Sequence, residues 1–286
     1  MALDTNNIYR RQVQLLVRVL PLVDTEKCFA LKGGTAINLF YRTLPRLSVD
    51  IDLLYIPMDD RDTALLNIRE ALSRISKLIQ QKIPGTKVQN THDQSDALRL
   101  IVSQNEIRIK VELSPVIRGT VFPEVRMEVV EEVEREFGYV EMQVASLPDL
   151  FAGKLCAALD RQHPRDLFDV KQFIMQGDFN LELLNAVVVY LSPNSRPIHE
   201  LLNPQPNLTN LELAYENQFR GMTLHNECTV NELKETYMQL LGILQAGLQD
   251  NHRKFIMSVV SNKINYSLLD GVNERTLQNF SGLSKL

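Results

Sequence analysis

Cysteine is scarce in this chain of 286 residues. Cys28, Cys156 and Cys228 are odd in number and lie far apart in the sequence. A disulfide framework needs cysteines in pairs, and a Cys-x-x-Cys metal site needs two of them close together, so both kinds of cross-link are excluded. We expect the three thiols to be reduced and buried.

Long apolar runs are missing as well. No stretch without charged residues reaches the roughly 18 to 20 residues that span a bilayer, and the opening residues, MALDTNNIYRRQVQ, contain no apolar signal core. We therefore expect a cytoplasmic protein with no segment in a membrane.

The chain also lacks a large excess of charge of either sign. Its 31 Lys and Arg residues face 35 Asp and Glu residues, a formal net charge of −4. That balance excludes a protein that holds a polyanion through its overall charge, so any nucleic acid is bound locally. Residues 1–46 carry seven basic and three acidic side chains, a local +4. This segment is either a basic docking face or an ordinary solvated helix.

Three widespread sequence signatures are absent: Gly-x-Ser-x-Gly, the Walker A motif and Gly-x-Gly-x-x-Gly. Their absence argues against an α/β-hydrolase, a P-loop nucleotide hydrolase and a dinucleotide-binding enzyme. The functional residues must therefore be sought in other patterns.

The pattern of apolar residues that is present divides the chain in two. In the first part, short runs rich in β-branched residues follow or alternate with helical patterns, whereas from residue 146 a period of 3.6 prevails. We predict an α+β fold, in which residues 1–145 form a mixed β-sheet core with flanking helices and residues 146–286 form a helical domain. The predicted strands are CFALKG, LSVDIDLLYI, TKVQNT, ALRLIVSQ and IRIKVEL, with one or two more strands or a solvated glutamate-rich extension at 121–144. The predicted helices are a leading helix that ends before Pro21, a short helix through Phe40, one with an apolar stripe from Leu65 to Ile79, and 147–160, 164–176, 180–191, 208–219, 229–247 and 251–261.

Gly33, Gly34 and Thr35 stand where the first predicted strand turns into a helix. Two adjacent glycines leave main-chain N–H groups unobstructed at the positive end of that helix, which suits a phosphate group. Such a triplet alone is weak evidence, and its importance comes from the strand that follows it.

Asp50 and Asp52 lie two residues apart in the next predicted strand, so both carboxylates point to one face while Ile51 and Leu53 point to the other. In IRIKVEL, the same alternation places Glu112 on the polar face of a second strand. If the two strands are neighbours, three carboxylates converge, and they would take up protons unless a hard cation such as Mg²⁺ or Mn²⁺ held them. The alternatives are an edge strand with solvated acids and an exposed Glu112 balanced by Lys110.

Lys154 falls within the apolar stripe of the first predicted helix of the second part, where an ammonium needs an anion. A triphosphate would supply one, and the alternative is a lysine whose stem packs on the core and whose amine reaches water. Asp166 and Asp169 lie three apart on one face of the next helix. Asp166 also stands in the first turn, where an acid complements the helix dipole.

With these residues in place, the sequence resembles the AbiEii/AbiGii nucleotidyltransferase toxins, a family of bacterial abortive-infection and toxin–antitoxin systems within the DNA polymerase β-like superfamily. The superfamily signature is a double-glycine or Gly-Ser turn followed by a strand with Asp-x-Asp. The narrower family motifs are matched by Lys32, by Arg46-Leu47-Ser48, by Lys154 in LFAGKLCAAL and by Arg165-Asp166-Leu167-Phe168-Asp169. The resemblance covers about residues 28–175, and Glu112 stands where many relatives carry Asp.

The resemblance implies transfer of a nucleoside monophosphate from an NTP to an acceptor hydroxyl. Asp50, Asp52 and Glu112 would bind Mg²⁺ or Mn²⁺, and Glu112 would also be the general base. Lys154 would neutralise the leaving pyrophosphate, and Asp169 with Asp166 would orient Lys154 or contact the nucleotide. The implied nucleotide-binding residues are Lys32, Gly33, Gly34, Thr35, Arg46, Ser48, Lys154, Arg165 and Asp166. The acceptor would be the 3′ end of a tRNA, translation would be blocked, and an antitoxin would restrain the toxin as a repressor or as a direct inhibitor.

Two alternatives keep the fold but change the function. A non-catalytic regulator would bind GTP or a protein partner without turnover, although intact Asp50 and Asp52 argue against it. A nucleotidyltransferase of the antibiotic-modifying kind would act on a small molecule, and its helical part would line a compact acidic pocket. Transfer of label to RNA distinguishes all three.

Overall fold

We describe the protein with a computed structural model. It describes residues 8–43, 45–92, 98–113, 118–176, 179–194, 196–203, 208–223, 228–280 and 283. The first seven residues of the predicted leading helix, and Ala97 at the start of one predicted strand, lie outside these ranges. The chain divides into two compact units, Met1–Ser146 and Leu147–Leu286, which are described one at a time.

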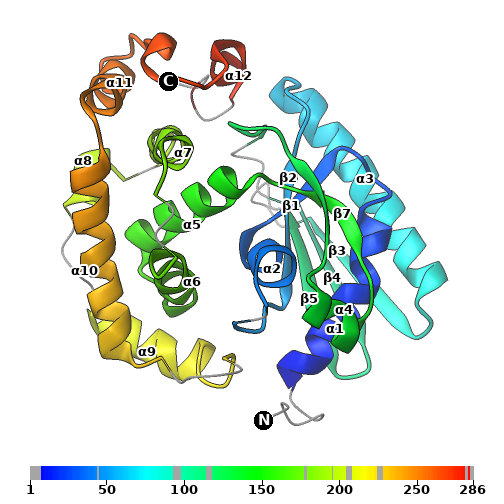
Figure 1. Cartoon of the computed structure of the whole chain (residues 1–286). Coiled ribbons are helices and arrows are strands. Elements are labelled where there is room, and N and C mark those ends of the chain that lie inside the picture. Colours follow the sequence, from blue (N-terminus) through cyan, green and yellow to red (C-terminus); the bar gives the residue numbers. More distant parts are fainter. Residues whose placement is uncertain are drawn as a thin grey trace. The chain divides into compact units, whose positions relative to one another are not determined.

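A seven-stranded mixed sheet forms the centre of the first unit, with the strand order β3-β4-β5-β2-β1-β7-β6 (Figure 1). The pairs β2–β5 and β1–β7 are parallel, and the other neighbours are antiparallel. The strands are β1 (Phe29–Lys32), β2 (Asp50–Tyr55), β3 (Thr86–His92), β4 (Leu98–Gln104), β5 (Ile107–Leu113), β6 (Val125–Glu128) and β7 (Glu141–Val144). The predicted α+β class with a mixed sheet is thereby confirmed.

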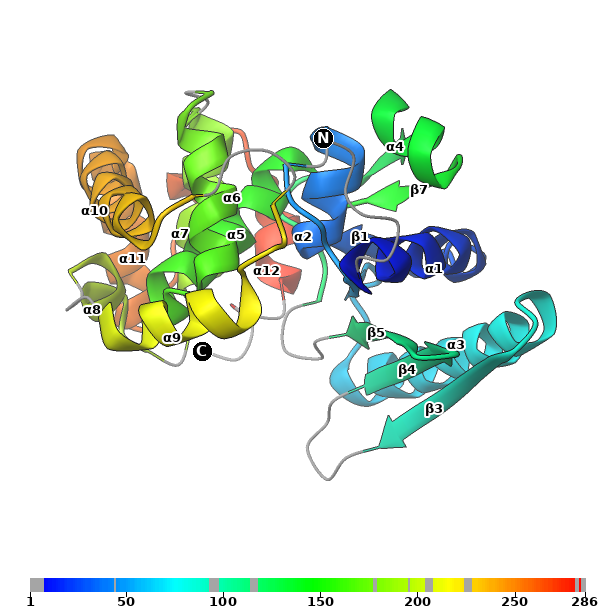
Figure 2. The same cartoon turned by 90° about the horizontal axis from the view of Figure 1, so that it is seen from below.

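Two long helices cover one face of this sheet. α1 lies against β5, and α3 runs along β3 and β4 (Figure 2). They bury the apolar residues that alternate along the strands, such as Leu100, Val102, Ile109 and Val111. The helices of this unit are α1 (Ile8–Val23), α2 (Gly33–Ala36), the π-helix η1 (Ile37–Tyr41), α3 (Arg61–Lys82) and α4 (Glu131–Phe137).

Two details of this unit differ from the sequence prediction. The leading helix does not end before Pro21, because α1 continues to Val23. Proline removes only one helical hydrogen bond there, whereas Leu20 and Val23 become fully buried. The segment 121–144, for which one or two strands or a solvated extension are predicted, contains two strands and also α4. This helix has Val133 as its one buried residue and therefore no apolar period. Glutamates in its first turn favour a helix through the dipole.

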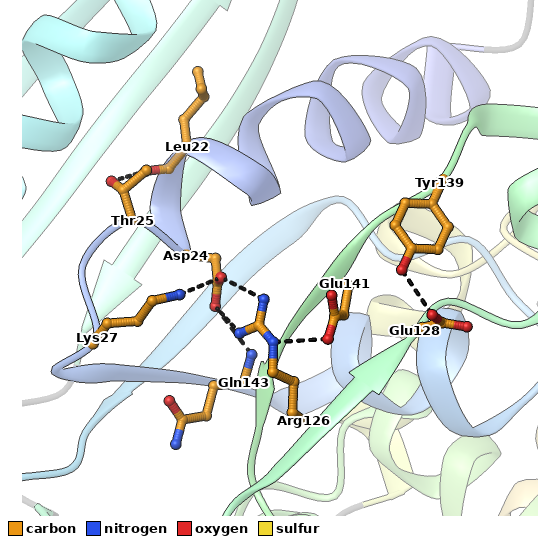
Figure 3. A network of polar contacts seen from close by, with 9 residues as sticks. All are labelled: Leu22, Asp24, Thr25, Lys27, Arg126, Glu128, Tyr139, Glu141 and Gln143. Carbon is orange, nitrogen blue, oxygen red and sulfur yellow. Dashed lines mark hydrogen bonds and ion pairs between the residues drawn. The ribbon is translucent and has the colours of Figure 1, made fainter.

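A cluster of polar side chains ties the end of α1 to the β6–β7 edge of the sheet (Figure 3). Asp24 accepts hydrogen bonds from Lys27, from the Arg126 guanidinium and from the main-chain N–H of Gln143. Arg126 also donates to Glu141. Burial alone would raise the pKa of Asp24, but these donors outweigh it and the pKa is lowered. The carboxylate thus stays charged and holds three chain segments together.

In the described residues of the second unit, all the regular elements longer than one residue are helices, and the predicted helices of this part are confirmed. α7 is buried nearly all round, which fits its continuous apolar sequence, and it packs against α5 and α11. Sequence periodicity misses α8, η2 and α12 because three to six residues are too few to show a period. The helices are α5 (Leu147–Arg161), α6 (Pro164–Ile174), α7 (Leu181–Leu191), α8 (Ile198–Leu202), α9 (Leu208–Gln218), α10 (Val230–Gly247), α11 (Asp250–Val260), the 3-10 helix η2 (Tyr266–Leu268) and α12 (Glu274–Asn279).

All three cysteines are free thiols. Cys156 and Cys228 are buried, as expected, whereas Cys28 is half-buried. Burial raises the pKa of Cys28 to about 11, and it raises the pKa values of Cys156 and Cys228 as well. In the described part of the chain, each helix is too short or too polar to cross a bilayer.

Candidate active site

The register of the sheet brings the predicted acids side by side. β2 pairs with β5 so that Asp52 lies opposite Glu112 and Asp50 lies opposite Lys110. β1 pairs with β2 so that Lys32 lies opposite Asp52. Residues that face each other across a strand pair point to the same side of a sheet, so Lys32, Asp50, Asp52 and Glu112 share one face.

The other face of β2 explains why this strand holds its place. Ile51 and Leu53 are fully buried, while Asp50 and Asp52 are half-buried. A shift of the strand by one residue would bury both carboxylates and expose both aliphatic side chains. The alternation seen in the sequence therefore fixes the direction of the two acids.

The double glycine lies in direct contact with this strand. Gly33 has a φ of +72°, and a Cβ at this position would collide with Asp52 Oδ2. A Cβ at Gly34 would collide with Arg46 Nη2 and would lie 3.0 Å from Ser48 Oγ. A side chain at either glycine would therefore displace a neighbouring group, and these groups are the residues that the sequence motifs single out.

Hydrogen bonds fasten the turn after β1 to the segment before β2. The Thr35 hydroxyl is buried, donates to the main-chain carbonyl of Asp50 and lies 3.0 Å from Ser48 Oγ. Arg46 is 2 % exposed and donates from Nη1 to the Leu47 carbonyl. The hydroxyl of Thr35 therefore fixes the turn, and the predicted contact of Thr35 with a phosphate oxygen stays a prediction.

Asn38 is a residue of this site that the sequence analysis does not single out. It is fully buried in η1, and its side-chain amide donates to the Gly34 carbonyl at 2.7 Å. A π-helical turn of this kind often marks a functional site. The available signal was a polar residue between Ile37 and Leu39, four positions after Gly34, within an otherwise apolar helix.

Lys32 adds a cation at the same place. Burial lowers the pKa of its ammonium, and the Asp52 carboxylate opposite offsets only part of that effect. Among the described residues, no hydrogen bond or ion pair holds this ammonium. It is therefore a group that an incoming phosphate would stabilise.

The residues fit a divalent cation through two acids rather than three. Glu112 Oε1 lies 2.7 Å from Arg99 Nε and 3.9 Å from Lys110 Nζ, so it is held by cations. Within the described residues, no three His, Cys, Asp or Glu side chains are arranged to hold a metal ion. Mg²⁺ is commonly bound by one or two carboxylates together with substrate phosphates and water. Asp50 and Asp52 meet that requirement, and a metal-binding Glu112 stays a prediction.

The second unit contains a buried charge cluster on α5 and α6. Lys154 Nζ lies 2.9 Å from Asp166 Oδ1 and 3.0 Å from Asp169 Oδ2, and all three side chains are at most 8 % exposed. Arg161 approaches Asp166 with two nitrogens, at 2.6 Å and 3.2 Å. Burial alone would raise the pKa of Asp166, but Lys154 and Arg161 hold it well below its usual range. The two carboxylates thus fix the position of the Lys154 ammonium.

Arg165 lies at the start of α6, next to Asp166 in the sequence. Its main-chain N–H donates to Nδ1 of His163, which caps the helix, and Pro164 occupies the first helical position. The residue is half-buried. Its predicted contact with a nucleotide, like the joint action of Lys154 with Asp50 and Asp52, stays a prediction because these groups belong to different units.

Replacing Gly33 by Ala should damage the site more than the fold. A left-handed φ costs an alanine about 1 to 2 kcal/mol, and the new methyl group must also push Asp52 aside. We expect nucleotidyl transfer to fall by more than about tenfold, since a small displacement of a reacting group is costly. Gly85→Ala is the matched control, because Gly85 has a φ of +76° and open space around its Cβ position. Activity and unfolding free energy are measured for both variants. If both lose the same activity and are equally stable, the close approach of Gly33 to Asp52 is not what the reaction depends on.

A glycine turn against a strand with two aspartates on one face defines the core of a nucleotidyltransferase. The family described as nucleotidyl transferase AbiEii toxin, type IV toxin–antitoxin system, matches residues 14–226, and the chain belongs to this family. It is therefore a nucleotidyltransferase toxin, with an NTP as substrate and an antitoxin as partner.

A solved structure shows the same fold. The protein is similar to MenT4, a nucleotidyltransferase toxin of Mycobacterium tuberculosis H37Rv, with a TM-score of 0.62 and 16 % sequence identity. The similarity covers 88 % of this chain and 93 % of that one. A comparison with curated proteins finds no match.

Proposed function

We propose that this toxin transfers a nucleoside monophosphate from an NTP to the 3′-terminal hydroxyl of a tRNA and thereby blocks translation. The observation that carries the proposal is the contact between the glycine turn and Asp52, with Asp50 beside it on the same face. The contact supports the proposal, because a turn that binds phosphate beside two carboxylates would suit transfer of a phosphoryl group between two oxygens.

In the proposed reaction, the acceptor hydroxyl oxygen forms a bond to the α-phosphorus of the NTP. The bond from that phosphorus to the oxygen bridging to the β-phosphate breaks, pyrophosphate leaves, and the hydroxyl proton passes to a carboxylate. Asp50 and Asp52 would hold Mg²⁺, which would neutralise phosphate charge and lower the pKa of the acceptor hydroxyl. Glu112 accepts the proton in this proposal. This requires that the ion pair between Glu112 and Arg99 first breaks.

The turn after β1 binds the triphosphate. Gly33 and Gly34 leave the main-chain N–H groups at the start of α2 unobstructed, and the helix dipole favours an anion there. Lys32 contributes an ammonium that no hydrogen bond or ion pair holds in the described residues, although the Asp52 carboxylate attracts it. Arg46 and Ser48 pack against Gly34 and keep the turn in place.

Lys154 stabilises the negative charge that develops on the leaving pyrophosphate. Its support is the geometry of the second unit, in which Asp166 and Asp169 fix the ammonium at 2.9 Å and 3.0 Å. A charge held in place before the reaction costs no reorganisation in the transition state. A lysine that only covered the core would instead extend its amine into water.

Label transfer tests the proposal. The purified protein is incubated with each α-labelled NTP, Mg²⁺ and bulk tRNA, and in parallel with candidate small acceptors such as aminoglycosides. We expect label in tRNA with the wild type and none with the Asp50→Ala, Asp52→Ala double variant. Label in a small acceptor alone would establish the antibiotic-modifying alternative. Nucleotide binding without transfer to any acceptor would establish the regulator.

A further inference from the structure

Within the described residues of the first unit, no helix covers the face of β3, β4 and β5 that lies opposite α1 and α3. We call it the open face, and it consists of the side chains of β3, β4 and β5 that point away from the two helices. Its members are Lys87, Gln89, Arg99, Ile101, Ser103, Arg108, Lys110 and Glu112. All of them are exposed or half-exposed, whereas the alternate residues of β4 and β5 are mostly buried. Apart from Glu112 and its partners Arg99 and Lys110, these residues take no part in the active site described above.

The open face carries four cations and one carboxylate. Glu112 is shared by Arg99 and Lys110. Lys87 and Arg108 are both exposed and form no ion pair with any described residue. The excess of three positive charges on this face contrasts with the net charge of −4 of the chain and would attract a partner with negative charge.

The charges continue directly into the active site. One row across the sheet runs from Arg99 through Glu112 and Asp52 to Lys32. The next row joins Lys110 to Asp50, and Arg108 follows two residues earlier on β5. Neighbouring strands lie about 4.8 Å apart, and alternate residues of a strand about 7 Å apart. The cations therefore extend away from the aspartates over more distance than one small acceptor spans.

We propose that the open face binds the sugar–phosphate backbone of the RNA acceptor just before its 3′ end. The proposal rests on the proposed function, because it places the terminal hydroxyl at Asp50 and Asp52. The open face has no aromatic side chain on which bases could stack, and its long cations suit phosphate oxygens. Binding is thus tolerant of sequence and falls steeply with salt.

The test compares two double charge reversals. Lys87→Glu with Arg108→Glu alters the open face, and Lys77→Glu with Lys82→Glu makes the same charge change on α3, which covers the opposite face. Binding of 5′-labelled bulk tRNA is followed by fluorescence anisotropy at several salt concentrations. We expect the open-face variant to bind about tenfold more weakly at low salt, with its salt slope reduced by about 1.4, and the α3 variant to bind like the wild type.

Transfer assays on the same proteins separate the inference from the proposed function. The KM for tRNA should rise in the open-face variant, while the KM for the NTP stays unchanged. Equal tRNA binding and equal KM values in both variants, with active wild type, would overturn the inference and leave the proposed function intact. A wild type that binds tRNA through the open face without transferring label would reject the proposed function instead. Unfolding by urea verifies that both variants are folded.

Discussion

Asp52→Asn should reduce nucleotidyl transfer by about a thousandfold or more, a loss of roughly 4 kcal/mol of transition-state stabilisation. The amide has the shape of the carboxylate but supplies a neutral, weaker oxygen to a divalent cation. It still fits against Gly33, and it removes one negative charge next to Asp50 and Glu112. We therefore expect the unfolding free energy to stay within about 1 kcal/mol of the wild type.

Single-turnover transfer measurements and urea unfolding test this pair of expectations. Asp62→Asn is the control, since Asp62 is an exposed acid in the first turn of α3 and lies outside the site. It should cost at most about 1 kcal/mol of stability through the helix dipole and leave transfer intact. An Asp52→Asn enzyme that keeps a tenth of the wild-type rate would remove Asp52 from the reaction.

Lys154→Met should have the largest effect on stability. It leaves Asp166 and Asp169 buried near each other without the ammonium that both contact. Breaking a buried ion pair on one side costs about 3 to 5 kcal/mol, because the remaining charge is uncompensated. Arg161 continues to hold Asp166, which places the expected loss near the lower end. Transfer should fall by about a hundredfold or more, as for other fixed charges that stabilise a transition state.

The pH dependence of this variant has a definite sign. In the wild type, the pKa of Asp166 is lowered, so this carboxylate stabilises the folded protein above pH 3.8. That contribution is lost as the pH falls through the pKa that Asp166 has in the folded protein. Without Lys154, the burial of Asp166 is opposed by Arg161 alone, so we expect the pKa of Asp166 to be higher than in the wild type. The deficit in unfolding free energy should therefore shrink as the pH falls through the pKa of Asp166 in the variant.

Two further variants separate support of the fold from support of the reaction. Lys171→Met removes a lysine that pairs with Glu232 at a partly exposed site, so it should cost at most about 1 kcal/mol. Adding Asp169→Asn to Lys154→Met should restore part of the stability but none of the activity. Recovery of transfer in that double variant would show that Lys154 acts only on the fold.

The predictable part of the site is the part that one strand or turn encodes by itself. Alternation along β2 sufficed to place Asp50 and Asp52 on one face, and the glycine pair sufficed to locate a tight turn. The contact of Gly33 with Asp52 depends on the pairing of β1 with β2, for which the sequence offers no direct signal. The sequence also offers no direct signal for the contact of Arg99 with Glu112, which depends on the pairing of β4 with β5.

The fold shows the same division. Helices with several turns, such as α3 and α10, were located by their apolar period, whereas α4 was hidden because a helix with one buried residue has no stripe. The sequence predicts that α1 ends before Pro21, because proline tends to end a helix. The helix continues to Val23, because the burial of Val23 outweighs that tendency. Local rules therefore fail where a segment is short or where packing overrides them.

The raised thiol pKa values have a practical consequence for work on this toxin. A thiol reacts as its thiolate, so at neutral pH the three native cysteines are slow toward maleimides and oxidants. A cysteine introduced at an exposed position such as Gln89→Cys would react first. A single dye could thus be attached to the wild-type background without removing any native cysteine, and its fluorescence would report the arrival of a polynucleotide.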